Sequence, residues 1–125
     1  MKNKLLPILA IIILTAIILT SCGGSSEPTY SAEDVTAGGE IFASTCSACH
    51  GPDAKGLPNL GKDLTTSEYV RDNNDETLLL LLVGGRPSGH ELNTTGVDMP
   101  PRGGNSSLSD DDLRTVIAYL RSINQ

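Results

Sequence analysis

Metal-ligating and positively charged side chains are scarce in this chain of 125 residues, which contains three cysteines, two histidines and two methionines. The chain is acidic, with 9 Lys and Arg residues against 15 Asp and Glu residues. Such a surface repels nucleic acid and anionic lipid head groups, so nucleic acid is not expected as a partner. The length suffices for one small domain, and no internal repeat is visible.

Two of the three cysteines lie together in the segment Cys46-Ser47-Ala48-Cys49-His50. Two cysteines at this spacing with a histidine directly after the second form the attachment signature of a c-type haem. The spacing has a chemical reason, because the two thiols can add to the two vinyl groups on one edge of a porphyrin. The next residue then lies beneath the iron, where its imidazole becomes the proximal ligand. The segment therefore predicts one covalently attached haem c at Cys46, Cys49 and His50.

Paired cysteines at this spacing also occur in thioredoxin-like redox sites and in zinc sites. A redox pair of that type is embedded in a βαβ pattern, and no such pattern is visible around the motif. A zinc site with four ligands needs further Cys or His residues, and only Cys22 and His90 remain. Haem attachment is therefore favoured, because the start of the chain indicates a different role for Cys22.

The start of the chain has the pattern of a bacterial export signal. A short basic segment with Lys2 and Lys4 precedes an almost wholly apolar run over residues 5–20, which ends in Leu19-Thr20-Ser21-Cys22. This ending resembles the lipobox, in which the chain is cleaved before a cysteine that is acylated. We therefore expect a lipoprotein signal peptide over residues 1–21 and a lipid on Cys22.

Two alternatives remain for this segment, an uncleaved membrane anchor and plain secretion. The apolar run has 16 residues, slightly fewer than the roughly 17–25 that span a bilayer. The residues after Cys22 are Gly-Gly-Ser-Ser, small and flexible as a lipidated N-terminus requires. With two cysteines on haem and one on lipid, none is left for a disulfide. The domain is expected on the extracytoplasmic, periplasmic side of a bacterial membrane.

Residues 22–33 are rich in Gly, Ser, Glu and Pro, which predicts a flexible linker. A flexible chain of this length reaches on average roughly 18 Å, so the domain would stay beside the membrane. Removal of the signal peptide would also remove Lys2 and Lys4 and leave a formal charge of −8. A partner with a basic docking surface is therefore favoured over an acidic partner.

Helical patterns occur throughout the domain, which is expected over residues 34–125. The first helix is expected over residues 34–47, with Asp34 as its N-cap. Gly38 and Gly39 lie inside it, and a glycine within a helix costs about 1 kcal/mol relative to alanine. Such glycines indicate either that another helix crosses closely at this point or that the first turn is frayed.

Further helices are expected over residues 67–72 and 75–83, and the last begins after residue 109. The unbroken leucine run over residues 78–82 predicts a helix that is buried on more than one face. The last helix has Ser109 as its N-cap and Asp112 three residues later, close to a capping box.

A stretch of Gly, Pro, Asn and Ser without periodicity covers residues 84–108, and a loop of this length in a small domain is usually functional. It contains Met99, the only methionine after Met1. Two prolines follow Met99 directly and restrict the backbone there, which would help to hold a thioether in place. Met99 is therefore predicted as the second axial ligand of the iron. His90 is the competing candidate, but its polar neighbours are typical of a surface histidine.

Together these features resemble a monohaem class I cytochrome c of the small bacterial type, over the whole of residues 34–125. Gly38-x-x-Ile41-Phe42 before the haem motif is similar to the first helix of that family, and residues 116–120 are similar to its last helix. The resemblance implies an all-α cytochrome c fold, with three to four helices around one haem. It also implies that the two matching helices cross at Gly38.

The resemblance further implies roles for residues around the haem. The carbonyl of Pro58 would accept the Nδ1–H of His50, and Leu60 would pack on the edge of the haem. The haem propionates have no assigned partner, and the candidates by residue type are Tyr69, Arg86, Asn93 and Arg102.

Ligation by His50 and Met99 would leave no free position on the iron, which suits electron transfer and not catalysis. We therefore expect a lipid-anchored, non-enzymatic carrier. It would accept electrons from a membrane quinol-oxidising complex and deliver them to a terminal oxidase or another acceptor. One alternative is a resident monohaem subunit of a respiratory complex, similar to that of alternative complex III. A peroxidase would normally carry a second haem motif, a gas sensor would need a labile Met99 position, and a structural lipoprotein would contain no haem.

Overall fold

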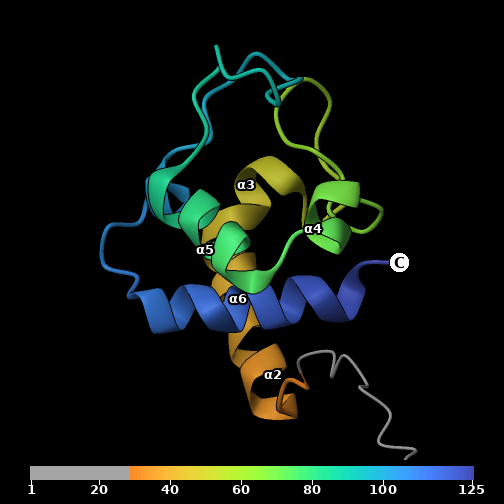
Figure 1. The fold of residues 1–125 in the computed structure, drawn as a ribbon, viewed down its shortest axis with the longest axis vertical. Coiled ribbons are helices and arrows are strands. Elements are labelled where there is room, and N and C mark those ends of the chain that lie inside the picture. Colours follow the sequence, from red (N-terminus) through yellow and green to blue (C-terminus); the bar gives the residue numbers. More distant parts are fainter. Residues whose placement is uncertain (1–28) are drawn as a thin grey trace, which may run out of the picture.

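The computed structural model describes residues 29–125, so the expected signal peptide, Cys22 and most of the expected linker lie outside the described residues. The described part consists of helices joined by loops (Figure 1). Two isolated β-bridges, Leu57 with Gly61 and Arg86 with Met99, pair parts of the loops. This arrangement confirms the all-α prediction. None of the helices within residues 29–125 is long and apolar enough to cross a membrane. In chain order the elements are α2 (Ala32–Ile41), η1 (Phe42–Cys46), α3 (Ser47–His50), α4 (Glu68–Asp72), α5 (Asp75–Gly84), η2 (Pro101–Gly104) and α6 (Asp110–Ile123).

The first helical segment begins earlier and ends later than the sequence predicts. Ser31 is the N-cap of α2, because its hydroxyl accepts the N–H of Asp34 at 3.0 Å. The prediction that Asp34 is the cap is therefore wrong. Its carboxylate lies instead in the first turn, where its negative charge interacts favourably with the positive end of the helix dipole. The π-helical turn η1 and the short helix α3 continue α2 directly, so one helical segment leads to His50.

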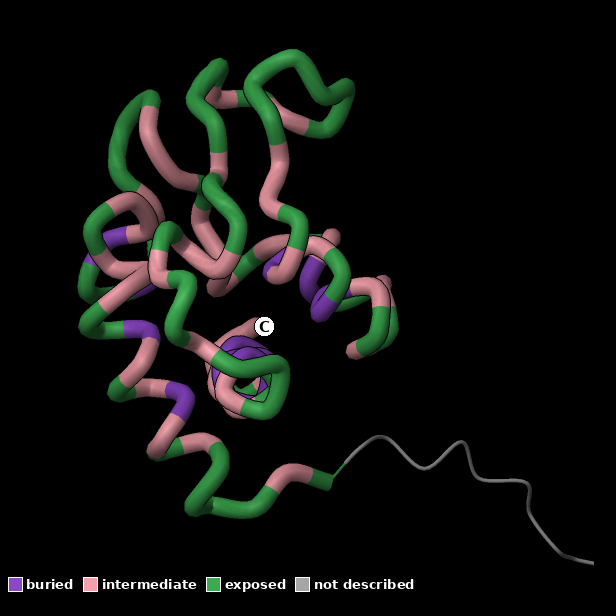
Figure 2. The backbone as a smooth tube through the Cα atoms, turned by 90° about the vertical axis from the view of Figure 1, so that its left-hand side faces the viewer, coloured by how far each residue is buried: buried purple, intermediate pink, exposed green. Residues whose placement is uncertain are grey.

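The crossing of α2 and α6 forms the centre of the fold. A Cβ atom at Gly38 would lie 1.9 Å from the carbonyl oxygen of Thr115, so the two backbones touch at this glycine. Beside the crossing, the rings of Phe42 and Tyr119 have their centroids 5.2 Å apart. Figure 2, in which α6 is seen nearly end-on, shows buried residues around this helix. The predicted close crossing at Gly38 is therefore confirmed.

Helix α5 buries one side and exposes the other. It begins after Asn74, whose side chain accepts the N–H of Thr77, and Gly85 is its C-cap. The leucine run is expected to be buried on more than one face, and Leu80, which is 72% exposed, limits that burial to one side of the helix. The buried leucines of α5 are Leu78, Leu79 and Leu82.

Helix α6 has the capping box that the sequence predicts. The Ser109 hydroxyl accepts the N–H of Asp112 at 3.1 Å, and the Asp112 carboxylate accepts the N–H of Ser109 at 2.8 Å. The pair satisfies two backbone donors at the start of the helix. The side chains that α6 buries in the core are Leu113, Val116, Ile117, Ala118 and Leu120.

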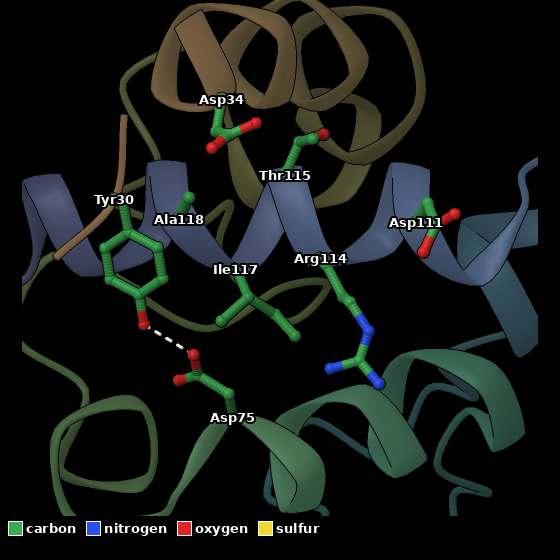
Figure 3. A pocket seen from close by; sticks show the side chains of 8 residues that line it. All are labelled: Tyr30, Asp34, Asp75, Asp111, Arg114, Thr115, Ile117 and Ala118. Carbon is green, nitrogen blue, oxygen red and sulfur yellow. Dashed lines mark hydrogen bonds between the residues drawn. The ribbon is translucent and has the colours of Figure 1, made fainter. Parts of the chain in front are cut away.

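The chain just before α2 is bound to the helical domain through Tyr30. The Tyr30 hydroxyl donates to the carboxylate of Asp75 at 2.6 Å (Figure 3), and Arg121 of α6 donates to the other oxygen of this carboxylate at 2.9 Å. Burial and the hydrogen bond to Asp75 raise the pKa of Tyr30 to about 12. The contacts of the domain therefore reach back to Tyr30, four residues before the expected boundary at Asp34.

Candidate haem site

The Cys-x-x-Cys-His motif lies at the end of the first helical segment and lines a cavity of about 660 Å³. Cys46 and Cys49 are both partly buried and do not form a disulfide. Burial, with a smaller contribution from Cys49, raises the pKa of the Cys46 thiol to about 11, so this thiol is protonated at neutral pH. A thiol-disulfide redox site uses a thiolate of lowered pKa, which this environment disfavours. A thioether to a porphyrin carries no charge and suits the same environment.

The carbonyl that orients His50 belongs to Lys62. Nδ1 of His50 lies 2.9 Å from the carbonyl oxygen of Lys62, so the prediction that Pro58 supplies this carbonyl is wrong. The bridge between Leu57 and Gly61 folds this segment into a tight turn, and Pro58 is exposed within that turn. With Nδ1 occupied by the Lys62 carbonyl, Nε2 is the ring nitrogen left for a metal.

A close backbone contact brings the Lys62 carbonyl to the imidazole. A Cβ atom at Gly61 would lie 2.2 Å from the carbonyl oxygen of Cys49, so the chain at Gly61 lies directly on the haem motif. Leu60 precedes this contact, is partly buried and lines the same cavity as the motif. The segment over residues 60–62 therefore contributes both an apolar wall and the acceptor for His50.

Met99 reaches the cavity from the long loop between α5 and α6, and the loop is held there by backbone pairing. The N–H of Arg86 donates to the carbonyl of Met99 and the N–H of Met99 donates to the carbonyl of Arg86, both at 2.8 Å. Gly85 has a φ of 71°, and a Cβ atom there would lie 2.3 Å from the Met99 carbonyl oxygen, so only glycine fits. The N–H of Ser88 also donates to the Asp98 carboxylate, which lowers the pKa of Asp98.

His90, the competing candidate ligand, lies elsewhere on this loop. Its side chain is exposed, and its Nδ1 accepts the N–H of Leu92 at 3.1 Å. His90 is not among the residues that line the cavity, whereas Met99 is. The structure therefore brings Met99, and not His90, to the cavity that holds the cysteine motif.

The cavity suits a haem in size, polarity and available donors. Its volume falls within the roughly 300–1,000 Å³ that is typical of cofactor sites. A porphyrin supplies its own four nitrogens, so the protein needs to offer only axial ligands. Within residues 29–125, no three His, Cys, Asp or Glu side chains cluster as they would around a bare metal ion. The apolar side chains that form much of the wall include Phe42, Leu64, Val70, Leu78, Leu82 and Val116.

Residues 33–120 match the model of the family described as "Cytochrome C oxidase, cbb3-type, subunit III". The chain belongs to this family. The FixP subunit of the cbb3-type cytochrome c oxidase of Bradyrhizobium sp. (strain ORS 278) is 40% identical over 63 residues, which are 50% of this chain and 22% of FixP. The CcoP subunit of Rhodobacter capsulatus is 34% identical over 89 residues, which are 70% of this chain and 29% of CcoP. The chain thus spans less than a third of the length of these curated relatives.

Two solved cytochromes cL have a similar structure. Cytochrome cL of Methylophaga aminisulfidivorans MPT superposes with a TM-score of 0.57 and 26% identity, over 83% of this chain and 72% of that protein. Cytochrome cL of Hyphomicrobium denitrificans gives a TM-score of 0.53 and 27% identity, over 74% of this chain and 48% of that protein. The resemblance to class I monohaem cytochromes c and the predicted cytochrome c fold are confirmed. The cofactor of this cytochrome c is covalently bound haem c, and its role is electron transfer through that group.

Proposed function

We propose that this cytochrome c carries electrons through one haem that is attached to Cys46 and Cys49 and ligated by His50 and Met99. The observation that supports this proposal is that all four side chains line one largely apolar cavity. A haem iron takes up and releases one electron, and two protein ligands leave it no open position for a substrate. Ligation by methionine also favours a higher reduction potential than ligation by two histidines.

The residues around these ligands hold them in fixed positions. The Lys62 carbonyl fixes the tautomer and the ring orientation of His50. The paired backbones of Arg86 and Met99 and the two prolines after Met99 restrict the segment that carries the thioether. Since the same ligands serve both oxidation states, little has to rearrange when an electron is transferred. The apolar wall limits access of water to the site.

The expected setting is a respiratory membrane. We propose that the protein accepts electrons from a quinol-oxidising complex and passes them to a terminal oxidase or another acceptor on the extracytoplasmic face. The relatives FixP and CcoP are subunits of cbb3-type oxidases, which supports a respiratory role. The export signal and the lipobox-like sequence support an anchor on Cys22. Mass spectrometry of the protein purified from membranes would show diacylglycerol on Cys22, and an unmodified, uncleaved N-terminus would contradict the anchor.

A resident subunit of a respiratory complex is the second candidate, and the names of the relatives favour it. Purification from membranes in mild detergent separates the two candidates. A resident subunit co-purifies with its complex in a fixed ratio, whereas a mobile carrier is released or recovered in a variable ratio.

Carbon monoxide tests the ligation that distinguishes a carrier from a gas sensor or a peroxidase. The optical spectrum of the reduced wild-type protein is expected not to change when carbon monoxide is added, because Met99 occupies the second axial position. Met99→Ala is expected to bind carbon monoxide and to retain its covalently attached haem. Ready binding by the wild-type protein would exclude the proposed ligation and favour a sensor or a peroxidase.

A further inference from the structure

Three cationic side chains line the haem cavity, and they differ in how their charge is neutralised. They are Lys62, Arg86 and Arg102. Arg102 already has a partner, because it donates to the Asp110 carboxylate at 2.6 Å and to the Leu108 carbonyl at 2.8 Å. No carboxylate within residues 29–125 forms an ion pair with Lys62 or Arg86. Among the described residues, two positive charges at the cavity, on Lys62 and Arg86, therefore form no ion pair with a carboxylate.

Arg86 is the one of these two that the fold holds in place. Its guanidinium carbon lies 4.6 Å from the centroid of the Tyr69 ring, and Tyr69 itself packs against the core. The backbone of Arg86 is paired with Met99 through two hydrogen bonds. Lys62, in contrast, is exposed. A stacked guanidinium loses less conformational freedom when it binds an anion than a free ammonium group does.

We propose that the guanidinium of Arg86, supported by the ring of Tyr69, binds a propionate carboxylate of the haem. This assignment rests on the proposed function, in that it requires haem in this cavity. Each haem carries two propionates, and burial of a carboxylate in an apolar site is costly without a cationic partner. The planar fork of Arg86 matches a carboxylate with two parallel hydrogen bonds. Arg86 would then hold a propionate, and Met99, whose backbone is paired with that of Arg86, would hold the iron.

The pairing has electrochemical consequences. A guanidinium beside a propionate lowers the pKa of that carboxyl, which keeps it ionised at neutral pH. A positive charge near the haem also favours the reduced state, which carries one positive charge fewer than the oxidised state. Loss of Arg86 should therefore lower the reduction potential and make it depend on pH, as the propionate begins to titrate. The other titratable side chains that line the cavity are His50, Lys62, Asp63, Glu68, Tyr69, Asp72, Asp98 and Arg102, and they are common to wild type and variant.

Redox titration of the purified holoprotein between pH 5 and 8 tests the proposal. Arg86→Gln is expected to have a lower midpoint potential than wild type and a steeper dependence on pH. Arg114→Gln removes the same charge from an exposed arginine that pairs with Glu76 outside the cavity, and it should match wild type. Equal potentials and equal pH dependence in Arg86→Gln and wild type would overturn the proposal. The proposal would also be overturned if Lys62→Gln lowered the midpoint potential and Arg86→Gln did not.

A second variant covers the case in which Arg86→Gln fails to fold. Arg86→Lys keeps the charge but loses the fork and the stacking, so we expect a smaller drop in potential and a shifted propionate mode in the resonance Raman spectrum. An unchanged propionate mode in Arg86→Lys would contradict the assignment. The carbon monoxide experiment on wild-type protein separates this outcome from a failure of the proposed function, because it tests the iron ligands and not Arg86.

Discussion

Gly85 and Met99 approach so closely that a Cβ atom on Gly85 would lie 2.3 Å from the carbonyl oxygen of Met99. This contact lies directly beside the backbone pairing of Arg86 with Met99. The end of helix α5 therefore determines where the loop presents its thioether. The position of an axial ligand thus depends on a glycine that does not itself reach the iron.

Gly85→Ala should loosen the Met99 loop, because alanine at a φ of 71° is strained and its Cβ overlaps the Met99 carbonyl. We expect a loss of about 1–3 kcal/mol in the free energy of unfolding and new binding of carbon monoxide to the reduced protein. Gly84→Ala is the matched control, since a Cβ atom there meets nothing within 4 Å. Denaturant unfolding and optical titration measure the two effects. An intact Met99 ligand in Gly85→Ala would contradict this role for Gly85.

A second pair of substitutions tests the acceptor of His50. Pro58→Ala keeps the carbonyl at this position but removes the ring that restricts the turn, and it should leave the reduction potential and the spectrum unchanged, because Pro58 is exposed and the Lys62 carbonyl accepts the hydrogen bond. Gly61→Ala should reduce the yield of holoprotein, because its Cβ would overlap the carbonyl of Cys49 and displace Lys62. Haem content after expression and the midpoint potential are the measurements. A larger effect of the substitution at Pro58 than of the one at Gly61 would contradict the assignment of the Lys62 carbonyl as the acceptor of His50.

The parts of the structure that the sequence predicts well depend on residues close in the chain or on side-chain chemistry. The Ser109 cap with Asp112 is one such feature, since both partners lie within one helical turn. The close crossing at Gly38 was also predictable, because a glycine within a helix lowers its stability and therefore indicates a position where a larger side chain does not fit. The acceptor of the His50 hydrogen bond could not be predicted, because every residue carries a carbonyl and the sequence does not show which carbonyl a turn places beside the imidazole. The glycine at position 61 is the signal that the sequence contained, since its lack of a Cβ atom is what allows the chain to lie on the Cys49 carbonyl.

The exposed face of α5 and the choice of Arg86 as the propionate partner are two further features that the sequence alone does not determine. The leucine run predicts an apolar helix but not which of its leucines faces solvent, and in the described part of the chain that leucine is Leu80. By residue type, the candidates for the propionates were Tyr69, Arg86, Asn93 and Arg102. Only the structure distinguishes them, since Arg102 is bound to Asp110 while Arg86 lies over the ring of Tyr69.

The contact of Tyr30 with Asp75 predicts a loss of stability in alkali. The pKa of Tyr30 is raised from 10.0 to about 12, so the hydroxyl is easier to ionise in the unfolded chain than in the folded protein. The stabilisation by this group is complete below pH 10 and is lost as the pH rises towards 12. Tyr30→Phe should remove this pH dependence and cost about 1 kcal/mol at neutral pH, where the hydrogen bond to Asp75 is lost.

Urea unfolding of both proteins at several pH values between 8 and 12 measures the effect of Tyr30. Tyr119→Phe is the control, because its ring packs on Phe42 and its hydroxyl makes no hydrogen bond within residues 29–125. If wild type and Tyr30→Phe lose stability in parallel over this range, Tyr30 is not the group that titrates.

The most direct test of the proposed ligation is an NMR spectrum of the reduced holoprotein with methyl-labelled methionine. Met99 is the only methionine after Met1, so its methyl signal is easily assigned by comparison with Met99→Ala. If Met99 is bound to the iron, its methyl group lies over the porphyrin, and the ring current moves its signal far upfield. This upfield signal is expected in wild type and absent from Met99→Ala. A Met99 methyl signal at the ordinary position of a free methionine would contradict the proposed His50 and Met99 ligation.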